Sequence, residues 1–197
     1  MKTIGITGGV GSGKTALLNA IKKEVNCRVF LADEIAHTLE EPGQSCYEPL
    51  VQLLGTDVLD ERGFLDKSKM SRVVFKDKAL LEQVNRIVHP AVKEAIRTGI
   101  EKARKEGGVD FCFVEAALFL EAGYRDLAEE VWYIYADEKA RTDRLFAGRG
   151  YSLSKIKSIM AKQLQEEVFR RECQVVIDNS VSIAHAMEQV RAELNNK

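Results

Sequence analysis

The stretch Gly8-Gly9-Val10-Gly11-Ser12-Gly13-Lys14-Thr15 decides the fold. It matches the phosphate-binding loop pattern G-x-x-x-x-G-K-(S/T), in which a glycine-rich turn joins a strand to a helix. Residues 2–7 are predicted to form the strand, and residues 15–22 the helix. Successive backbone N–H groups and the positive end of the helix dipole then face one point, which makes an anion site. The alternative is a glycine-rich turn that only connects two elements, and the Lys-Thr pair in its expected position argues against it.

The residue types in this loop suit the phosphates of a nucleotide. Gly8, Gly11 and Gly13 allow the backbone to curl and to approach oxygen atoms without a Cβ in the way. Lys14 places a compact positive charge on the outer phosphates, and Thr15 offers a hydroxyl to Mg²⁺. We therefore predict nucleotide contacts from Gly9, Val10, Gly11, Ser12, Gly13, Lys14 and Thr15. The loop alone does not identify the acceptor of the phosphate.

The composition is that of a globular protein of one domain with insertions. The chain has 197 residues, of which 45% are hydrophobic and 30% charged, enough to bury a core. Its net charge of −1 argues against general attraction to nucleic acid or to a membrane. The cysteines are far apart and lack zinc-site spacing; they are Cys27, Cys46, Cys112 and Cys173. With no signal segment before the first strand, we expect a reducing, cytoplasmic location.

Four further apolar runs predict strands, at residues 28–31, 109–114, 131–135 and 174–177. They are mostly unbroken rather than alternating, as expected for strands that are covered on both faces. Helical stretches separate them, which indicates βαβ units with right-handed crossovers. The sequence therefore predicts an α/β fold, a P-loop NTPase core with a five-stranded parallel sheet flanked by helices, a helical substrate-binding insertion and a helical lid.

The substrate-binding insertion separates the second and third predicted strands by nearly eighty residues, far more than one crossover needs. Asp77 is expected to cap a helix, and Pro90 to begin a further helix that reaches about residue 105. The other helical patterns cover residues 33–39, 49–54 and 77–88. We assign residues 34–106 to an acceptor-binding domain, and residues 1–33, 107–138 and 172–197 to the nucleotide-binding core.

A second insertion, residues 139–171, is strongly basic. It holds nine Lys and Arg against three Asp and Glu, a local charge of +6 in a chain whose total is −1. Gly148 and Gly150 flank Arg149, and Ser152 is placed to cap a following helix. A basic pair of helices joined by glycines, in a chain with a phosphate loop, predicts a mobile lid that closes on polyphosphate. A solvated pair of charged helices is the alternative.

Five side chains outside the loop are candidates for the chemistry. Asp33 follows the second strand, where a carboxylate can accept a proton from an attacking hydroxyl or cap the next helix. Glu115 ends the third strand, where it would orient Mg²⁺ through water or only face solvent. Arg144 and Arg149 suit phosphate oxygens, with surface ion pairs as the alternative. His89 is interpreted as structural, because phosphoryl transfer does not require a histidine.

Short motifs also recur along the chain in a fixed order. They are residues 4–14, residues 32–36, Glu41-Pro42-Gly43, Gly55 with Val58-Leu59, Leu65-Asp66, Arg72 with Val74-Phe75, Ile87-Val88-His89-Pro90, Leu118 with Glu121-Ala122-Gly123, Arg144-Leu145, Arg149, and Val176-Ile177-Asp178-Asn179. Most are weak singly. In this order and spacing they are specific, and over almost its entire length the chain resembles the dephospho-coenzyme A kinase family.

The resemblance implies transfer of the γ-phosphate of ATP, with Mg²⁺, to the ribose 3′-hydroxyl of dephospho-coenzyme A, the last step of coenzyme A synthesis. Asp33 matches the family's proposed catalytic aspartate and Arg149 its lid arginine, and Lys14 completes the implied catalytic set. The other residues implied are Arg144 and Asn179 for ATP, Asp33, Arg72, His89, Leu118 and Glu121 for the acceptor, and Thr15 and Glu115 (through water) for the metal. A turn and helix cap is the alternative role of Asp178-Asn179.

Three segments depart from the family's usual pattern. Leu31 stands where the family has an aspartate, so any metal role of that carboxylate passes to another group. After the third strand, Glu115 replaces an aspartate and Ala117 a proline, which changes the expected shape of the loop. Residues 172–175 replace an Ala-Asp-Asp lead into the last strand. None of these changes forbids catalysis.

Other functions remain open at the level of the sequence. A nucleoside, nucleotide or sugar kinase would share the loop. A GTPase-type switch would require a D-x-x-G segment, and residues 60–63 match it, but in a turn-like region and without an N-K-x-D segment. We expect ATP and dephospho-coenzyme A as small-molecule partners, no nucleic acid or membrane, and a monomer or weak homo-oligomer.

Overall fold

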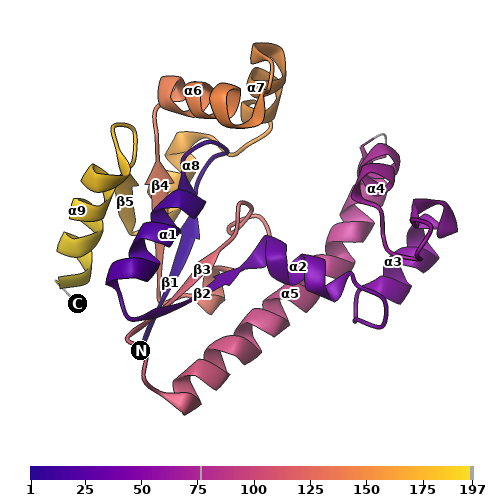
Figure 1. Cartoon of the computed structure of the whole chain (residues 1–197), viewed down its shortest axis with the longest axis horizontal. Coiled ribbons are helices and arrows are strands. Elements are labelled where there is room, and N and C mark those ends of the chain that lie inside the picture. The colour runs from indigo at the N-terminus through magenta and orange to yellow at the C-terminus, as the bar shows by residue number, and fades with distance from the viewer. Residues whose placement is uncertain (76, 196–197) are drawn as a thin grey trace. The chain divides into compact units, whose positions relative to one another are not determined.

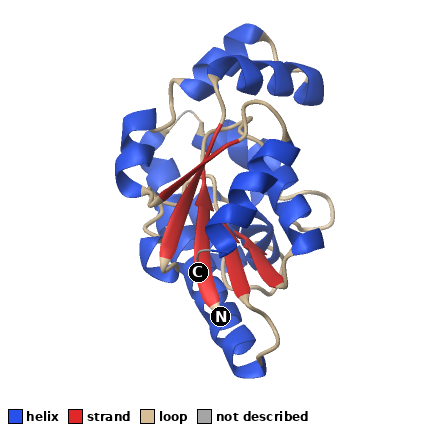
Figure 2. Cartoon of the chain, turned by 90° about the vertical axis from the view of Figure 1, so that its left-hand side faces the viewer, coloured by secondary structure: helices blue, strands red, loops and turns tan. Residues whose placement is uncertain are grey.

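The computed structural model describes residues 1–75 and 77–195, and its strands form one parallel sheet. The strands are β1 (Lys2–Thr7), β2 (Cys27–Leu31), β3 (Phe111–Glu115), β4 (Glu130–Tyr135) and β5 (Val175–Asp178). Their order is β2-β3-β1-β4-β5, so β1 is central, and Figure 2 shows them side by side. The predicted α/β class is confirmed, and each predicted strand is present with bounds that shift by at most two residues.

Burial explains why the strands are apolar without alternation. In β1, Ile4 is 0% and Ile6 1% exposed, and both Phe113 of β3 and Trp132 of β4 are 0% exposed. Ile4 lies beside Phe113 in the register of β1 with β3, and Ile6 lies beside Trp132 in the register of β1 with β4. On the opposite face, Val114 of β3 and Val131 of β4 both lie beside Gly5 and are also 0% exposed, so other parts of the protein cover both faces of the sheet. Because the strands are parallel, their carboxyl ends meet at the edge where the phosphate loop begins.

The helices are α1 (Lys14–Glu24), α2 (Ala32–Leu39), α3 (Tyr47–Leu54), α4 (Lys67–Val74), α5 (Lys78–Glu106), α6 (Glu138–Arg149), α7 (Leu153–Met160), α8 (Glu166–Glu172) and α9 (Ile183–Asn195), with 3₁₀ turns η1 (Thr56–Val58) and η2 (Arg125–Leu127). Along the chain, α2–α5 lie between β2 and β3, and α6–α8 lie between β4 and β5 (Figure 1). In the part of the chain that the structure describes, no helix combines the length and the apolar character needed to cross a membrane.

The chain divides into two compact units. One consists of residues 1–30 with residues 103–197 and holds the phosphate loop, and the other consists of residues 31–102. In the second unit, the D-x-x-G string forms a turn in which Asp60 Oδ1 accepts hydrogen bonds from the N–H groups of Arg62 and Phe64, both at 2.9 Å. A GTPase switch would require this string to follow a strand of the sheet, but here it lies between η1 and α4. The acceptor-binding and lid roles of residues 34–106 and 139–171 stay predictions.

Pro90 does not begin a helix, contrary to the sequence-based prediction. It lies inside α5, which runs without a break from Lys78 to Glu106. Asp77 caps this helix as predicted, since its Oδ1 accepts from the N–H of Leu80 at 3.1 Å. A proline inside a helix costs about 3 kcal/mol, but buried side chains continue at helical spacing on both sides of it. They are Val88, Val92, Ile96, Ile100 and Ala103, and their packing outweighs the local preference.

Residues 139–171 form parts of three helices, α6, α7 and α8, rather than the predicted pair. Gly150 ends α6 in the left-handed conformation, with φ of 61°. Gly148 lies inside α6 and is not a joint. Ser152 caps α7 as predicted, because its side chain accepts from the N–H of Lys155 at 3.3 Å. The extra helix, α8, is anchored on β4 by Phe169, whose ring stacks on Tyr133 at 4.7 Å between centroids.

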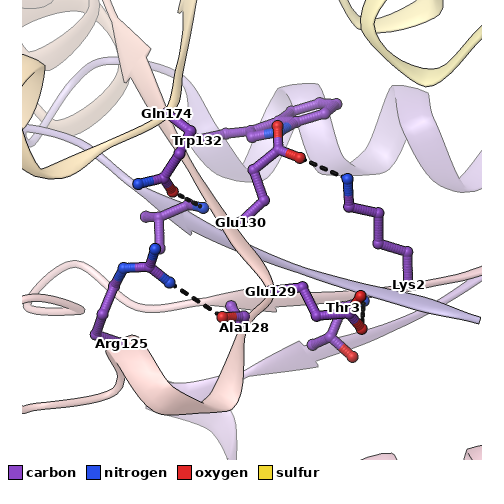
Figure 3. A network of polar contacts seen from close by, with 9 residues as sticks. Lys2, Thr3, Arg125, Ala128, Glu129, Glu130, Trp132 and Gln174 are labelled. Carbon is purple, nitrogen blue, oxygen red and sulfur yellow. Dashed lines mark hydrogen bonds and ion pairs between the residues drawn. The ribbon is translucent and has the colours of Figure 1, made fainter. Parts of the chain in front are cut away.

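A polar network joins the amino ends of β1 and β4 (Figure 3). Glu130 accepts hydrogen bonds from Lys2 Nζ at 2.7 Å and from Trp132 Nε1 at 2.8 Å. Gln174 accepts from the N–H of Val131 at 2.9 Å, which adds the segment that enters β5. Glu130 is 9% exposed, so these partners compensate the cost of burying its charge. The network fixes the two strands whose opposite ends carry the phosphate site.

Candidate active site

The phosphate loop lies tightly between β1 and α1, against the ends of two other strands. Gly13 has φ of 86°, a conformation that favours glycine, and a Cβ there would collide with Asn179 Nδ2. A Cβ on Gly8 would collide with the carbonyl oxygen of Ile134 in β4. The loop therefore requires glycine at these positions because of its neighbours as well as its curvature. The strand, glycine-rich turn and helix of the predicted motif are all present.

Lys14 folds back over the loop. Its Nζ donates to the carbonyl oxygen of Gly8 at 2.7 Å and to that of Gly9 at 3.3 Å, and the residue is 9% exposed. Thr15 is exposed in the first turn of α1. The loop thus brings an ammonium group, a hydroxyl and a helix N-terminus together, which is the arrangement that binds phosphate oxygens.

Arg144 and Asn179 hold the loop from α6 and from the end of β5. Arg144 donates to the carbonyl oxygens of Ser12 at 3.3 Å and Asn179 at 2.6 Å. Asn179 is fully buried, and its Nδ2 donates to the carbonyl oxygen of Ser12 at 2.7 Å. The structure therefore brings both residues to the loop, as their predicted role in binding ATP requires.

Asn179 does not cap the last helix, so this alternative role is wrong. Ser182 occupies that position, since its Oγ accepts from the N–H of His185 at 3.2 Å at the start of α9. Asp178 makes the turn, with Oδ1 accepting from the N–H of Ser180 at 2.8 Å. Within the described residues, Asn179 Oδ1 is buried without a hydrogen-bond partner.

Two residues that the sequence did not single out also contact the loop. Arg141 donates from Nε to the carbonyl oxygen of Val10 at 2.9 Å, and Gln163 accepts from the N–H of Val10 at 3.1 Å. Arg141 lies three positions before Arg144 on α6, so helical spacing could have indicated it. Gln163 lies in the connection between α7 and α8 and carries no comparable sequence signal.

Glu115 and Thr15 fit the modest demands of a magnesium ion that is held mainly by phosphates and water. Glu115 ends β3, beside Ile6 in the register with β1, and is 9% exposed. Thr15 presents its hydroxyl at the start of α1. No three His, Cys, Asp or Glu side chains gather as a metal cage within residues 1–75 and 77–195.

The loop after β3 carries Leu118 and Glu121, and both are exposed. Its shape is fixed without the family's proline at position 117, because the N–H of Ala122 donates to the carbonyl oxygen of Leu118 at 2.7 Å. Phe119 anchors the loop below, with its ring against Gly5, where a Cβ would collide with it. The two candidate acceptor residues thus stand on an anchored loop of the first unit.

Asp33 lies in the second unit, exposed in the first turn of α2. Leu31 is the N-cap residue of α2 and no side chain caps it, so the alternative role of Asp33 as a cap is wrong. Asp33 borders a cavity of about 370 Å³, which is also lined by Ala36, His37, Glu40, Lys67 and Met70. Burial raises the pKa of Glu40 in this wall.

The remaining predicted residues do not line the cavity beside Asp33. Arg72 is exposed on α4, and its Nε donates to the carbonyl oxygen of Ser68 at 3.2 Å. His89 lies half-buried within α5, where burial lowers its pKa. Arg149 is exposed at the last position of α6, with its guanidinium carbon 6.0 Å from the ring centroid of Tyr151.

Comparison with known proteins places the chain in a family. Residues 2–185 match the family model for dephospho-CoA kinase, CoaE. A dephospho-CoA kinase of Corynebacterium diphtheriae is 35% identical over 98% of this chain and 96% of its own length, and one of Carboxydothermus hydrogenoformans is 33% identical over 95% and 90%. The crystal structure of TT1252 from Thermus thermophilus is similar with a TM-score of 0.82 and 25% identity, over 99% of this chain and 97% of that one. The chain therefore belongs to the dephospho-CoA kinase family, a family of ATP-dependent kinases.

Proposed function

We propose that this protein transfers the γ-phosphate of ATP to the ribose 3′-hydroxyl of dephospho-coenzyme A, which gives coenzyme A and ADP. The observation that carries the proposal is the phosphate loop with Lys14 folded over it, in a chain that belongs to the dephospho-CoA kinase family over residues 2–185. We also propose that the protein acts in the cytoplasm on these small molecules, as a monomer or weak homo-oligomer.

For ATP, the loop residues bind the phosphates through backbone N–H groups, and Lys14 neutralises charge on the outer phosphates. Arg144 and Asn179 also bind ATP, Arg144 at the phosphate oxygens and Asn179 near the adenine. Support comes from their hydrogen bonds to Ser12 in the loop. Thr15 and, through water, Glu115 would hold Mg²⁺, which supplies further neutralisation of phosphate charge when bound.

For the acceptor, Asp33 accepts the proton of the 3′-hydroxyl as general base. Its exposure at the wall of a cavity of about 370 Å³ supports this role, since a base must be accessible to its substrate. Arg72, His89, Leu118 and Glu121 are proposed to bind the acceptor. Residues 34–106 form its domain, and residues 139–171 form a lid from which Arg149 binds the transferring phosphate.

The experiment that tests this assignment compares Asp33→Asn with Glu34→Gln, a neutralised carboxylate in the same exposed turn of α2. Loss of a general base lowers kcat by about 10²- to 10⁴-fold. We expect that loss for Asp33→Asn with an unchanged Kd for ATP, and wild-type turnover for Glu34→Gln. Turnover near that of the wild type in Asp33→Asn would remove Asp33 from the mechanism.

A further inference from the structure

Both backbone polar groups of Val10, in the middle of the phosphate loop, are bonded to side chains from residues 139–171. The N–H of Val10 donates to Gln163 Oε1 at 3.1 Å, and its carbonyl oxygen accepts from Arg141 Nε at 2.9 Å. Arg141 Nη2 donates to the same oxygen of Gln163 at 2.7 Å. These three residues close a ring of hydrogen bonds that ties the loop to α6 and to the connection between α7 and α8.

Arg141 is fitted closely to the loop. A Cβ on Gly9 would lie 2.6 Å from Arg141 Nη2 and 2.7 Å from its Cζ, so any side chain at residue 9 would displace the guanidinium. Arg141 is half-buried, and burial lowers its pKa, although a guanidinium keeps its proton at neutral pH. A charge removed from water needs acceptors. The oxygens of Val10 and Gln163 supply them.

Two hydrogen bonds hold the amide oxygen of Gln163 at the loop. Gln163 and Arg141 line a cavity of about 340 Å³, whose wall also includes Tyr133, Lys157 and Phe169. The amide oxygen of Gln163 accepts from both Val10 and Arg141, so it connects the backbone of the loop to the guanidinium.

We propose that Gln163 is a positioning residue of the phosphate loop. Its amide oxygen orients the N–H of Val10 and the guanidinium of Arg141, and so links the position of α6–α8 to the affinity of the loop for ATP. The inference rests on the proposed role of residues 8–15 as the ATP phosphate site. It adds a residue that acts through the backbone of the loop, although it lies 153 positions from Val10 in the sequence.

The chain offers a matched control in Gln165. This residue lies two positions further along the same connection, lines the same cavity and is exposed. It is the N-cap residue of α8, but no side chain makes a capping hydrogen bond there. Gln165→Leu therefore repeats the chemical change of Gln163→Leu in the same segment without removing a contact to the loop.

The test measures amide hydrogen exchange at Val10 by NMR without substrates, and the KM for ATP and kcat. In Gln163→Leu the Val10 amide should exchange about 3- to 10-fold faster, and the KM for ATP should rise by a similar factor, as expected for a neutral hydrogen bond. Because KM follows loop geometry, kcat should change less. In Gln163→Glu an acceptor remains, so the protection of the Val10 amide should persist. Gln165→Leu should match the wild type in each measurement.

Two results would overturn the inference. One is a Gln163→Leu protein with the Val10 exchange and KM of Gln165→Leu, and the other is an equal loss of Val10 protection in Gln163→Glu. If circular dichroism shows that Gln163→Leu does not fold, Arg141→Lys is tested in its place. An ammonium lacks the planar fork with which Arg141 spans both acceptors. Unchanged exchange of the Val10 amide in Arg141→Lys would count against the inference. Failure of the wild type to phosphorylate dephospho-coenzyme A would instead overturn the proposed function, and the exchange result would stand separately.

Discussion

The side-chain amide of Asn179 donates a hydrogen bond of 2.7 Å to the carbonyl oxygen of Ser12. The two residues are 167 positions apart in sequence, so the end of the last strand holds the loop that follows the first one. The backbone N–H of Asn179 also donates to the carbonyl oxygen of Tyr135 at 2.8 Å, which fixes it to the end of β4. The carboxyl ends of three strands thus shape the phosphate site.

Replacing Asn179 should weaken both the fold and the ATP site. Asn179→Ala removes the buried 2.7 Å hydrogen bond to the carbonyl oxygen of Ser12 and leaves the longer one from Arg144, at 3.3 Å; such a loss costs about 0.5–1.5 kcal/mol. Urea unfolding should report that loss of stability. A kinetic assay should show a higher KM for ATP. Asn26→Ala is the control, because Asn26 makes an exposed hydrogen bond of 2.9 Å to the carbonyl oxygen of Gly108; its cost should stay within about 0.5 kcal/mol. Equal effects of the two substitutions would contradict the anchoring role of Asn179.

A side chain at Gly13 should be tolerated less well than one at Gly107. Both glycines have positive φ, 86° and 67°, so alanine at either costs about 1–2 kcal/mol of backbone strain. At Gly13 the new Cβ also meets Asn179 Nδ2, whereas nothing lies within 4 Å at Gly107. Thermal unfolding and ATP titration should therefore show a larger loss for Gly13→Ala, with ATP affinity reduced in that variant alone. Similar losses of affinity would show that the contact with Asn179 is unimportant.

Neutralising Lys14 should abolish most of the transfer while the protein stays folded. Lys14→Met keeps the aliphatic stem and removes the charge placed over the loop. Removal of a group that stabilises transition-state charge costs about 10²- to 10³-fold in kcat, which a coupled ADP-release assay would measure. Lys23→Met changes an exposed lysine of the same helix and should keep wild-type turnover. Full activity of Lys14→Met would contradict the role assigned to the loop.

Much of the sheet and loop could be predicted from the sequence, because the deciding interactions are local or periodic. The strands appear as β-branched apolar runs that stay buried, as Ile4 and Ile134 do. The phosphate loop is a short motif whose conformation depends on its own glycines. Asp77 and Ser152 act as caps within three residues of their partners, so sequence spacing is sufficient to find them.

Features that depend on distant contacts could not be predicted in the same way. Pro90 is a strong local signal for a helix boundary, but the buried residues Val92 and Ile96 keep α5 continuous through it. The ring between Val10, Arg141 and Gln163 joins residues up to 153 positions apart. A glutamine in a loop has no pattern that distinguishes it from a solvated one, so only the structure identifies Gln163.

His89 should make the protein less stable in mild acid. Burial lowers its pKa from the ordinary 6.5, so below that pH the unfolded chain takes up a proton that the folded protein does not. Stability is then lost as pH falls through about 6.5 towards the lower folded value, with a slope of at most about 1.4 kcal/mol per pH unit. The unfolding free energy of the wild type minus that of His89→Asn should therefore fall from pH 7.5 to pH 5.5. Above pH 7.5, where histidine is neutral in both states, the difference should be constant; a difference independent of pH throughout would rule out this titration.

The most direct measurement is the reaction of the purified wild-type protein with ATP, Mg²⁺ and dephospho-coenzyme A. ADP release should accompany conversion of dephospho-coenzyme A to a product heavier by one phosphate, which phosphorus NMR should assign to the ribose 3′ position. Adenosine monophosphate and sugars, tested at the same concentration, should be poor acceptors. A folded protein that binds ATP but forms no coenzyme A, or that phosphorylates adenosine monophosphate or a sugar in preference, would contradict the proposed function.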